Sequence, residues 1–205
     1  MEEQVALLTK FIKESWETLQ QMYNCYDKLN IVSVGTEIAF RKQVLIDAGV
    51  RNPEIILDTI IKNIRDEDEM GTVSKTIFHP HYENNKLVIE NRVIISTENL
   101  FFMTYSDVDN REEMVYTTLR HEMGHCLVNH ILYDGCKTMS DVLIKRAHQI
   151  SQRQVDVSAY NNKWINGPTT PDEEVKMQVD YYTMIHDELA ANDAVGLTVE
   201  DMVDL

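Results

Sequence analysis

His121 and His125 stand four residues apart with Glu122 between them, in the stretch HEMGH at residues 121–125. On a helix, residues four apart lie on one face a turn apart, so both imidazoles can point at one ion. Zinc accepts neutral imidazole nitrogens as ligands at about 2.0–2.1 Å. Glu122 lies beside this pair, where its carboxylate can take a proton from a water molecule at the ion. The spacing therefore predicts a zinc site for hydrolysis, with Glu122 as the general base.

The residues around this motif favour metal ligation over an ordinary structural role for the two histidines. The flanking stretches MVYTTL and CLVNHIL are mostly apolar and predict a buried helix. Two histidines and a glutamate in such a helix would be costly without partners, and a metal ion supplies a partner. Gly124 costs a helix ~1 kcal/mol relative to alanine, which is easier to explain if another backbone packs closely there.

A catalytic zinc site needs a third protein ligand and one open position. Glu188 is the best candidate, because in HDELAANDAVG (186–196) it stands among small residues that let two helices approach closely. A lone carboxylate in such a stretch needs a partner, and zinc would provide one. If Glu188 is not the ligand, Asp187 and Asp193 are the alternatives.

HEMGH followed by ELAAN resembles the gluzincin metallopeptidases, and is similar to both the ImmA/IrrE-like group and the small phage-type or HtpX-like peptidases. The resemblance spans residues 72–197 in architecture but only these motifs in sequence, and residues 1–70 have no part in it. It implies a zincin-like fold, zinc bound by His121, His125 and Glu188, and Glu122 as the base. It further implies that a sheet edge beside the active helix binds the substrate peptide as an added strand. Residues 85–100 are expected to supply that edge.

Residues near the third ligand are candidates for orienting the ligands or stabilising the transition state. In the family, the residue four positions after the ligand glutamate often orients the first histidine. Here that residue is Asn192 rather than the commoner aspartate, and Asp193 follows it. A developing oxyanion calls for a second electrophile besides zinc, and the catalytic candidates for this role are Tyr181 and His186. Further candidates are Tyr182, His148 and Tyr160.

The charge balance limits the classes of partner. The chain has 205 residues and a net charge of −15, from 34 acidic and 19 basic side chains. This argues against nucleic acid and anionic membranes as partners, because both need a basic face. The resemblance to metallopeptidases implies a peptide or protein substrate, and the oligomeric state is not indicated.

The cysteines and the N-terminal segment predict the cellular compartment. Cys25, Cys126 and Cys136 show no paired spacing, which is typical of free thiols in a reducing compartment. The acidic, amphipathic N-terminus does not resemble a signal peptide, and no apolar run approaches the ~20 residues of a membrane span. We expect a cytoplasmic protein, or a phage- or virus-encoded one that is made in the cytoplasm and packaged.

The periodicity of apolar residues predicts an α+β fold, mainly helical, with a small antiparallel sheet next to the active-site helix. One domain is expected over residues 1–205, with an N-terminal helical part (1–70) and a zincin-like core (71–205). Turns are predicted at Asn84-Asn85 and Glu90-Asn91. Helices are predicted at residues 2–27, 36–48, 53–64, 112–133, 140–158 and 171–196, the last beginning at Pro171 after the N-cap Thr170, with a short helix after the N-cap Thr198.

Several other residues could contribute to function, but structural roles are favoured for them. His79 and His81 could indicate a second metal site, yet their spacing suits a strand or turn and no acidic partner is expected nearby. Cys126 follows His125 directly and should face away from the metal, in an apolar environment. Trp164 lies in the loop between two predicted helices, where packing is favoured over a role as a pocket anchor.

These observations lead to one main hypothesis and two alternatives. The main hypothesis is a small zinc-dependent endopeptidase that binds about one zinc ion per chain. The first alternative is a catalytically idle structural or interaction protein, such as a virion component, that keeps the metal site. The second is a metal hydrolase that acts on other bonds, which is less favoured because no phosphate-binding motif or extra carboxylate cluster accompanies the site.

Overall fold

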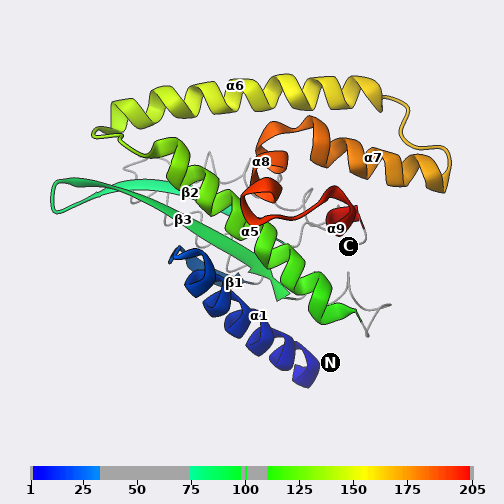
Figure 1. Ribbon diagram of the computed structural model, residues 1–205, viewed down its shortest axis with the longest axis horizontal. Helices are drawn as coiled ribbons and strands as arrows, with labels where there is room; N and C mark the ends of the chain where they lie inside the picture. Colours follow the sequence, from blue (N-terminus) through cyan, green and yellow to red (C-terminus); the bar gives the residue numbers. More distant parts are fainter. Residues whose placement is uncertain (1, 33–73, 98–99, 101–109, 204–205) are drawn as a thin grey trace, which may run out of the picture.

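The computed structural model describes residues 2–32, 74–97, 100 and 110–203, and shows an α+β arrangement of mainly helices around a small sheet (Figure 1). The predicted helices at 36–48 and 53–64 lie outside these residues. Among the described helices, none is both long and apolar enough to cross a bilayer. The elements are α1 (Glu2–Tyr23), β1 (Lys28–Val32), β2 (Ser74–Glu83), β3 (Lys86–Ser96), α5 (Arg111–Tyr133), α6 (Met139–Lys163), α7 (Pro171–Met184), α8 (His186–Val195) and α9 (Val199–Val203).

Helix α5 is central to the arrangement, because α1 packs along one side of it and α8 along another (Figure 1). Its buried residues Val115, Leu119 and Met123 join a core to which β3 and α1 also contribute. Helix α1 presents apolar side chains at steps of three and four residues, as expected for one buried face. These side chains are Leu8, Ile12, Trp16 and Leu19.

The sheet is mixed, with strand order β1-β3-β2, so the prediction of a purely antiparallel sheet was wrong in part. Strands β2 and β3 are antiparallel as predicted, but β1 pairs with β3 in parallel. Strand β1 was not predicted from the sequence. A parallel strand of five residues depends on a partner some sixty residues later, Lys28 pairing with Arg92, and has no hairpin signal of its own.

The two predicted turns had different outcomes. Asn84 and Asn85 have φ values of 49° and 63°, the left-handed conformation of a type I′ hairpin turn, so this prediction is confirmed. Glu90 and Asn91 are not in a turn but lie within β3. Asn91 is fully buried, and its backbone N–H donates to Asp27 Oδ1 at 2.9 Å. A long-range partner therefore outweighs the local turn tendency of asparagine.

Strand β3 is the central strand, which overturns the prediction that residues 85–100 supply a free edge for a substrate peptide. Strand β2 pairs with residues 86–95 of β3, which occupies the edge that faces the active-site helix, and β1 pairs with residues 92–96 on the other side. Among the described strands, β2 forms the edge of the sheet next to the active-site helix. Its residues Ser74 and Thr76 contact Glu122 of α5.

Helices α6 and α7 begin where local signals place them. Thr138 and Asp141 form a capping box at the start of α6, which runs to Lys163, five residues beyond the predicted end. Thr170 accepts a hydrogen bond from the backbone N–H of Glu173, and Pro171 is the first residue of α7, so both predictions are confirmed. The predicted cap Thr198 also accepts from the backbone N–H of Asp201.

The predicted helix from 171 to 196 is two helices, which corrects the sequence analysis. Ile185 adopts an extended conformation (φ −94°, ψ 105°) and is completely buried. The backbone N–H of His186, the first residue of α8, donates to Asp156 Oδ2 of α6 at 3.2 Å. A carboxylate from α6 therefore accepts a hydrogen bond from a backbone N–H group that has no partner within α8. The chain changes direction at Ile185, and α8 packs against α5 (Figure 1).

Candidate metal centre

Three side chains from two helices converge at one point: His121 and His125 of α5, and Glu188 of α8. The two Nε2 atoms are 3.1 Å apart, and each lies 3.2 Å from Glu188 Oε2. The histidine rings meet edge-on, with their planes at 84°. The tertiary structure thus brings together all three residues that the sequence analysis selected as zinc ligands.

The separations within this group suit a small divalent ion. Atoms bound 2.0–2.1 Å from a tetrahedral zinc lie about 3.3–3.4 Å from one another, close to the three measured separations. Lone pairs that point at one another repel unless a cation or a proton lies between them. The side chain of His125 is 20% exposed, against 9% for His121 and 8% for Glu188, so water can approach from the His125 side.

The position of Glu188 depends on an unusually close approach of α5 and α8. A Cβ atom added to Gly124 would lie 2.0 Å from the backbone oxygen of Ala191 and 3.1 Å from its Cα atom. Only glycine fits between the two backbones at this point. The expectation that another backbone packs against Gly124 is confirmed, and the contact fixes Glu188 one helical turn before Ala191.

The charges of the ligand group support one another. Burial would raise the pKa of Glu188, but hydrogen bonds from His121 and His125 outweigh burial and hold this pKa well below its usual value. Burial would lower the pKa of His121, but the hydrogen bond to Glu188 and the nearby charge of Glu122 raise it. Without an ion, the protonated histidine therefore balances the charge of Glu188, and a bound cation would displace that proton.

Asn192 orients the first histidine of the motif. Its Oδ1 atom lies 2.7 Å from His121 Nδ1, and the side chain is buried. An amide oxygen accepts from an N–H group, so this contact places a proton on Nδ1, and Nε2 is the nitrogen that faces Glu188 and would bind an ion once its own proton is lost. Asp193, the neighbouring candidate, is exposed on α8. The structure therefore places Asn192, and not Asp193, against His121.

Glu122 lies beside the ligand group and is held by strand β2. Its Oε1 atom accepts from the Ser74 hydroxyl at 2.6 Å, and its Oε2 atom accepts from the Thr76 hydroxyl at 2.5 Å. The residue is buried, with 4% of its surface exposed. The sequence analysis did not identify Ser74 and Thr76, because alternating hydroxyl residues in a strand are common and nothing local connects them to residue 122.

Comparisons with protein-family models, with curated proteins and with solved structures gave no match. The function of the site is therefore inferred from its own residues.

Arg153 of α6 is a further residue at the site that the sequence analysis missed. Its Nη1 atom donates to Glu188 Oε1 at 2.9 Å and also to Asp187. This leaves Oε2, the other oxygen of Glu188, facing the two imidazoles. Asp187, the alternative third ligand, is engaged by Arg153 instead. The polar stretch around residue 153 gave no signal for this role, since the contact spans 35 residues and depends on how α6 packs on α8.

We expect Arg153→Gln to weaken zinc binding about 10–100-fold, the usual effect of losing a group that orients a metal ligand. Without the Arg153 guanidinium, Oε1 keeps only the longer hydrogen bond from Tyr181 at 3.4 Å, and the Glu188 carboxylate can rotate away from the imidazoles. Competition with a chromophoric chelator measures the affinity. Arg146→Gln is the matched control, since Arg146 lies on the same helix but bonds to Gln149. An affinity equal to that of the parent would show that Arg153 does not position Glu188.

Two tyrosines line the group on the α7 side. The Tyr181 hydroxyl donates to Glu188 Oε1 at 3.4 Å, so this predicted candidate lies at the site. The Tyr182 ring meets His121 edge-on at 5.9 Å, and burial, together with the charge of Glu188, raises the pKa of Tyr182 to about 12. Burial and the charge of Glu188 also raise the pKa of Tyr181, so both hydroxyls remain protonated at neutral pH and can donate hydrogen bonds.

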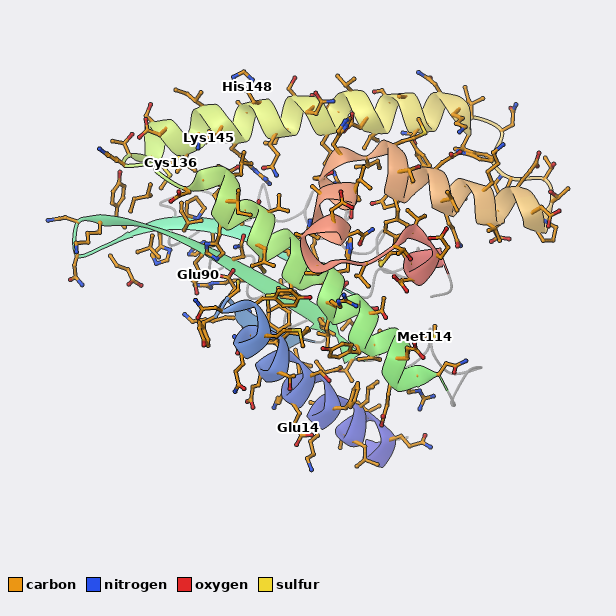
Figure 2. All side chains as sticks on the ribbon, in the orientation of Figure 1. Glu14, Glu90, Met114, Cys136, Lys145 and His148 are labelled. Atoms are coloured by element: carbon orange, nitrogen blue, oxygen red, sulfur yellow. The ribbon has the colours of Figure 1, made fainter. Side chains whose placement is uncertain are left out.

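The other candidates from the sequence analysis lie further from the ligands. The His186 side chain is 73% exposed and bonds to Asp156 through Nδ1 at 3.0 Å. Figure 2 shows His148 on the outer side of α6, where it is exposed. Tyr160 contacts the Tyr181 ring at 5.7 Å, in a layer behind the ligands. Trp164 Nε1 donates to Asp180 Oδ2 at 2.9 Å.

Two further groups in the described residues contain potential metal ligands. In the first, Glu90 of β3 lies opposite His79 and joins His81, and Glu83 Oε1 lies 3.1 Å from His81 Nε2, so the prediction that these histidines lack an acidic partner was wrong. Cross-strand pairing supplies the carboxylate, which sequence spacing does not reveal. Lys28 lies 3.0 Å from Glu90 and Arg92 lies 3.7 Å from it, so this carboxylate already has cationic partners.

The second of these groups consists of Cys25, Asp27 and His130. A hydrogen bond from Cys126 is the main cause that lowers the pKa of Cys25, to about 6. A hydrogen bond to Asp27 is the main cause that raises the pKa of His130, to about 10. The Cys25 thiol donates to Asp27 Oδ2, and its lowered pKa means that this proton is lost more readily than from an ordinary cysteine.

Proposed function

We propose that this protein hydrolyses peptide bonds with a zinc ion held by His121, His125 and Glu188. The observation that supports this most is the convergence of two imidazole Nε2 atoms and one carboxylate oxygen within 3.2 Å, with a second glutamate beside them. A set of two histidines and a glutamate is a known ligand set of catalytic zinc and leaves a position open for water.

Each residue around the ion would have a separate role in the reaction. Zinc, when bound, supplies a Lewis acid that acidifies water and polarises a carbonyl group. Glu122 takes a proton from the attacking water and delivers it to the leaving amine, while Ser74 and Thr76 hold its carboxylate in place. Asn192 and Arg153 keep His121 and Glu188 in the binding geometry. The Tyr181 hydroxyl is the candidate donor to the oxyanion.

A second candidate function is metal binding without hydrolysis, as in a structural or interaction protein. The hydrogen bonds to Glu122 favour it, because both carboxylate oxygens already accept from hydroxyl groups. A base engaged in this way is less available to a water molecule. The two functions differ in whether Glu122 affects the rate of peptide cleavage.

We expect His125→Ala and Glu188→Ala each to lower the zinc content by one ion per chain, since each removes one of three ligands. Metal analysis of the purified protein measures the content. His148→Ala is the matched control, because His148 is an exposed histidine on the outer side of α6. If Glu188→Ala retains zinc at the affinity of the parent, the third ligand is a different residue.

A further inference from the structure

The group of Cys25, Asp27 and His130 lies on the other side of α5 from the histidine pair of the proposed centre. His130 follows His125 by five residues, so the two side chains point in directions about 140° apart around the helix axis. Cys126 and His130 are themselves four residues apart, so α5 has a second i,i+4 pair of potential ligands on this other face. The short segment between α1 and β1 supplies Cys25 and Asp27.

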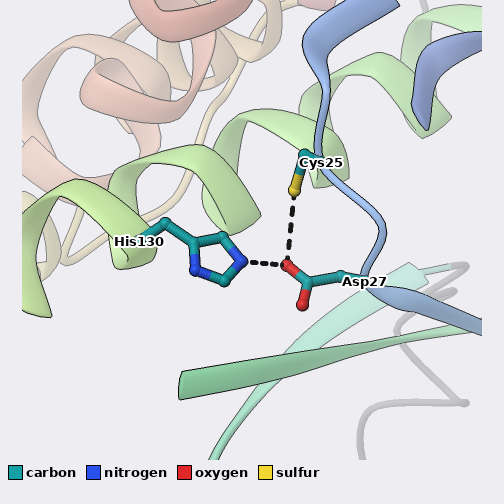
Figure 3. Close-up of side chains that lie close together, drawn as sticks. All are labelled: Cys25, Asp27 and His130. Carbon is teal, nitrogen blue, oxygen red and sulfur yellow. Dashed lines mark hydrogen bonds and ion pairs between the residues drawn. The ribbon is translucent and has the colours of Figure 1, made fainter. Parts of the chain in front are cut away.

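The three side chains meet at one carboxylate oxygen (Figure 3). Asp27 Oδ2 lies 2.7 Å from His130 Nε2 and 3.4 Å from Cys25 Sγ. The Cys126 thiol adjoins the group through a hydrogen bond with Cys25. Sulfur, imidazole nitrogen and carboxylate oxygen together form a mixed ligand set that zinc accepts.

The position of Asp27 is fixed by groups that do not belong to the cluster. Its carbonyl oxygen accepts from Trp16 Nε1 at 3.0 Å and from Gln20 at 2.9 Å. Its carboxylate accepts from the backbone N–H of Asn91 and from Asn91 Nδ2, each at 2.9 Å. Asn129 in turn donates to Asn91 Oδ1 at 2.7 Å. Such an outer layer of hydrogen bonds is typical of carboxylates that bind metal ions.

We propose that Cys25, Asp27 and His130 form a second zinc site that joins the end of α1 to α5. The ion would replace the proton between His130 and Asp27, and these two atoms would separate from 2.7 Å to the about 3.3 Å expected of two ligands on a tetrahedral zinc. Rotation of the His130 side chain, which is 39% exposed, can accommodate this change. A water molecule at the exposed His130 side supplies the fourth ligand.

This site is independent of the proposed peptidase centre, because it shares no ligand with it. Its role would be structural: three segments meet at the ion, namely the end of α1, helix α5 and, through Asn91, the central strand β3. A bound ion stabilises the folded state, since the unfolded chain has no preformed site.

Titration of the metal-free full chain with Co²⁺, followed by zinc competition, tests the proposal. A thiolate ligand gives an intense sulfur-to-cobalt charge-transfer absorption, which two histidines and a glutamate cannot produce. We expect this absorption, with two ions bound per chain, in the parent. The same absorption should remain in His125→Ala, with one ion fewer, so failure of the peptidase centre and failure of this site are distinguishable.

The variants Cys25→Ser and His130→Gln should each lose one ion and the charge-transfer absorption. Cys136→Ser is the matched control and should keep both, because Cys136 lies outside the group. His130→Gln alters a partly exposed side chain and provides a second variant in case Cys25→Ser does not fold. The proposal is overturned if the parent shows no sulfur-to-cobalt absorption, or if the absorption persists in a folded Cys25→Ser or His130→Gln protein.

Discussion

Replacing Glu122 with glutamine is expected to leave zinc bound and to lower the rate of peptide cleavage about 10²–10⁴-fold, the usual contribution of a general base. Glutamine has the shape of glutamate but cannot take a proton from water. Its amide oxygen can still accept from Ser74 or Thr76, so the surrounding packing should change little. Cleavage of a proteome-derived peptide library by the zinc-loaded parent and variant measures the effect, with the zinc content determined on the same samples.

Glu113→Gln is the matched control for this experiment. Glu113 is an exposed glutamate in the first turn of the same helix, and its replacement should change neither zinc content nor cleavage. Equal cleavage by the parent and Glu122→Gln would show that Glu122 is not the base. A parent that binds zinc at the centre but cleaves no peptide would instead support the non-hydrolytic metal protein.

Replacing Gly124 with alanine is expected to destabilise the protein and to weaken zinc binding at the histidine pair. The added methyl group would lie 2.0 Å from the Ala191 carbonyl oxygen, so α8 must move away from α5. Overpacking of this kind costs about 1–3 kcal/mol, or more where the obstacle is backbone. Because α8 bears Glu188 and Asn192, its movement opens the ligand group. Thermal unfolding and zinc titration measure the two effects.

The sign of the change in the free energy of unfolding distinguishes the two cases. In an unobstructed helix, alanine would stabilise the protein by about 1 kcal/mol relative to glycine. Gly135→Ala is a useful comparison: nothing lies within 4 Å of its added Cβ atom, but its φ of +75° disfavours alanine. It should lose about 1–2 kcal/mol of stability and keep its zinc. A stabilised, zinc-binding Gly124→Ala protein would contradict the close contact between α5 and α8.

The sequence by itself determined those features whose causes are local. The i,i+4 spacing of His121 and His125 places both imidazoles on one helical face wherever that helix packs. The caps Thr138 and Thr170 satisfy N–H groups three residues away, although the sequence analysis recognised only Thr170. The pair Asn84-Asn85 suits the left-handed turn of a hairpin. Each of these interactions spans only a few residues, so the sequence contains both partners side by side.

Only the tertiary structure decided which distant groups meet. The break at Ile185, which aims Glu188 at the histidines, depends on Asp156 of another helix. Contacts of Glu122 with Ser74 and of Glu188 with Arg153 span 48 and 35 residues. The position of Asn91 in the central strand depends on Asp27, which is 64 residues away. Burial removes the water that would compete for these groups. A long-range hydrogen bond can then contribute more free energy than the preference of a residue for a local conformation.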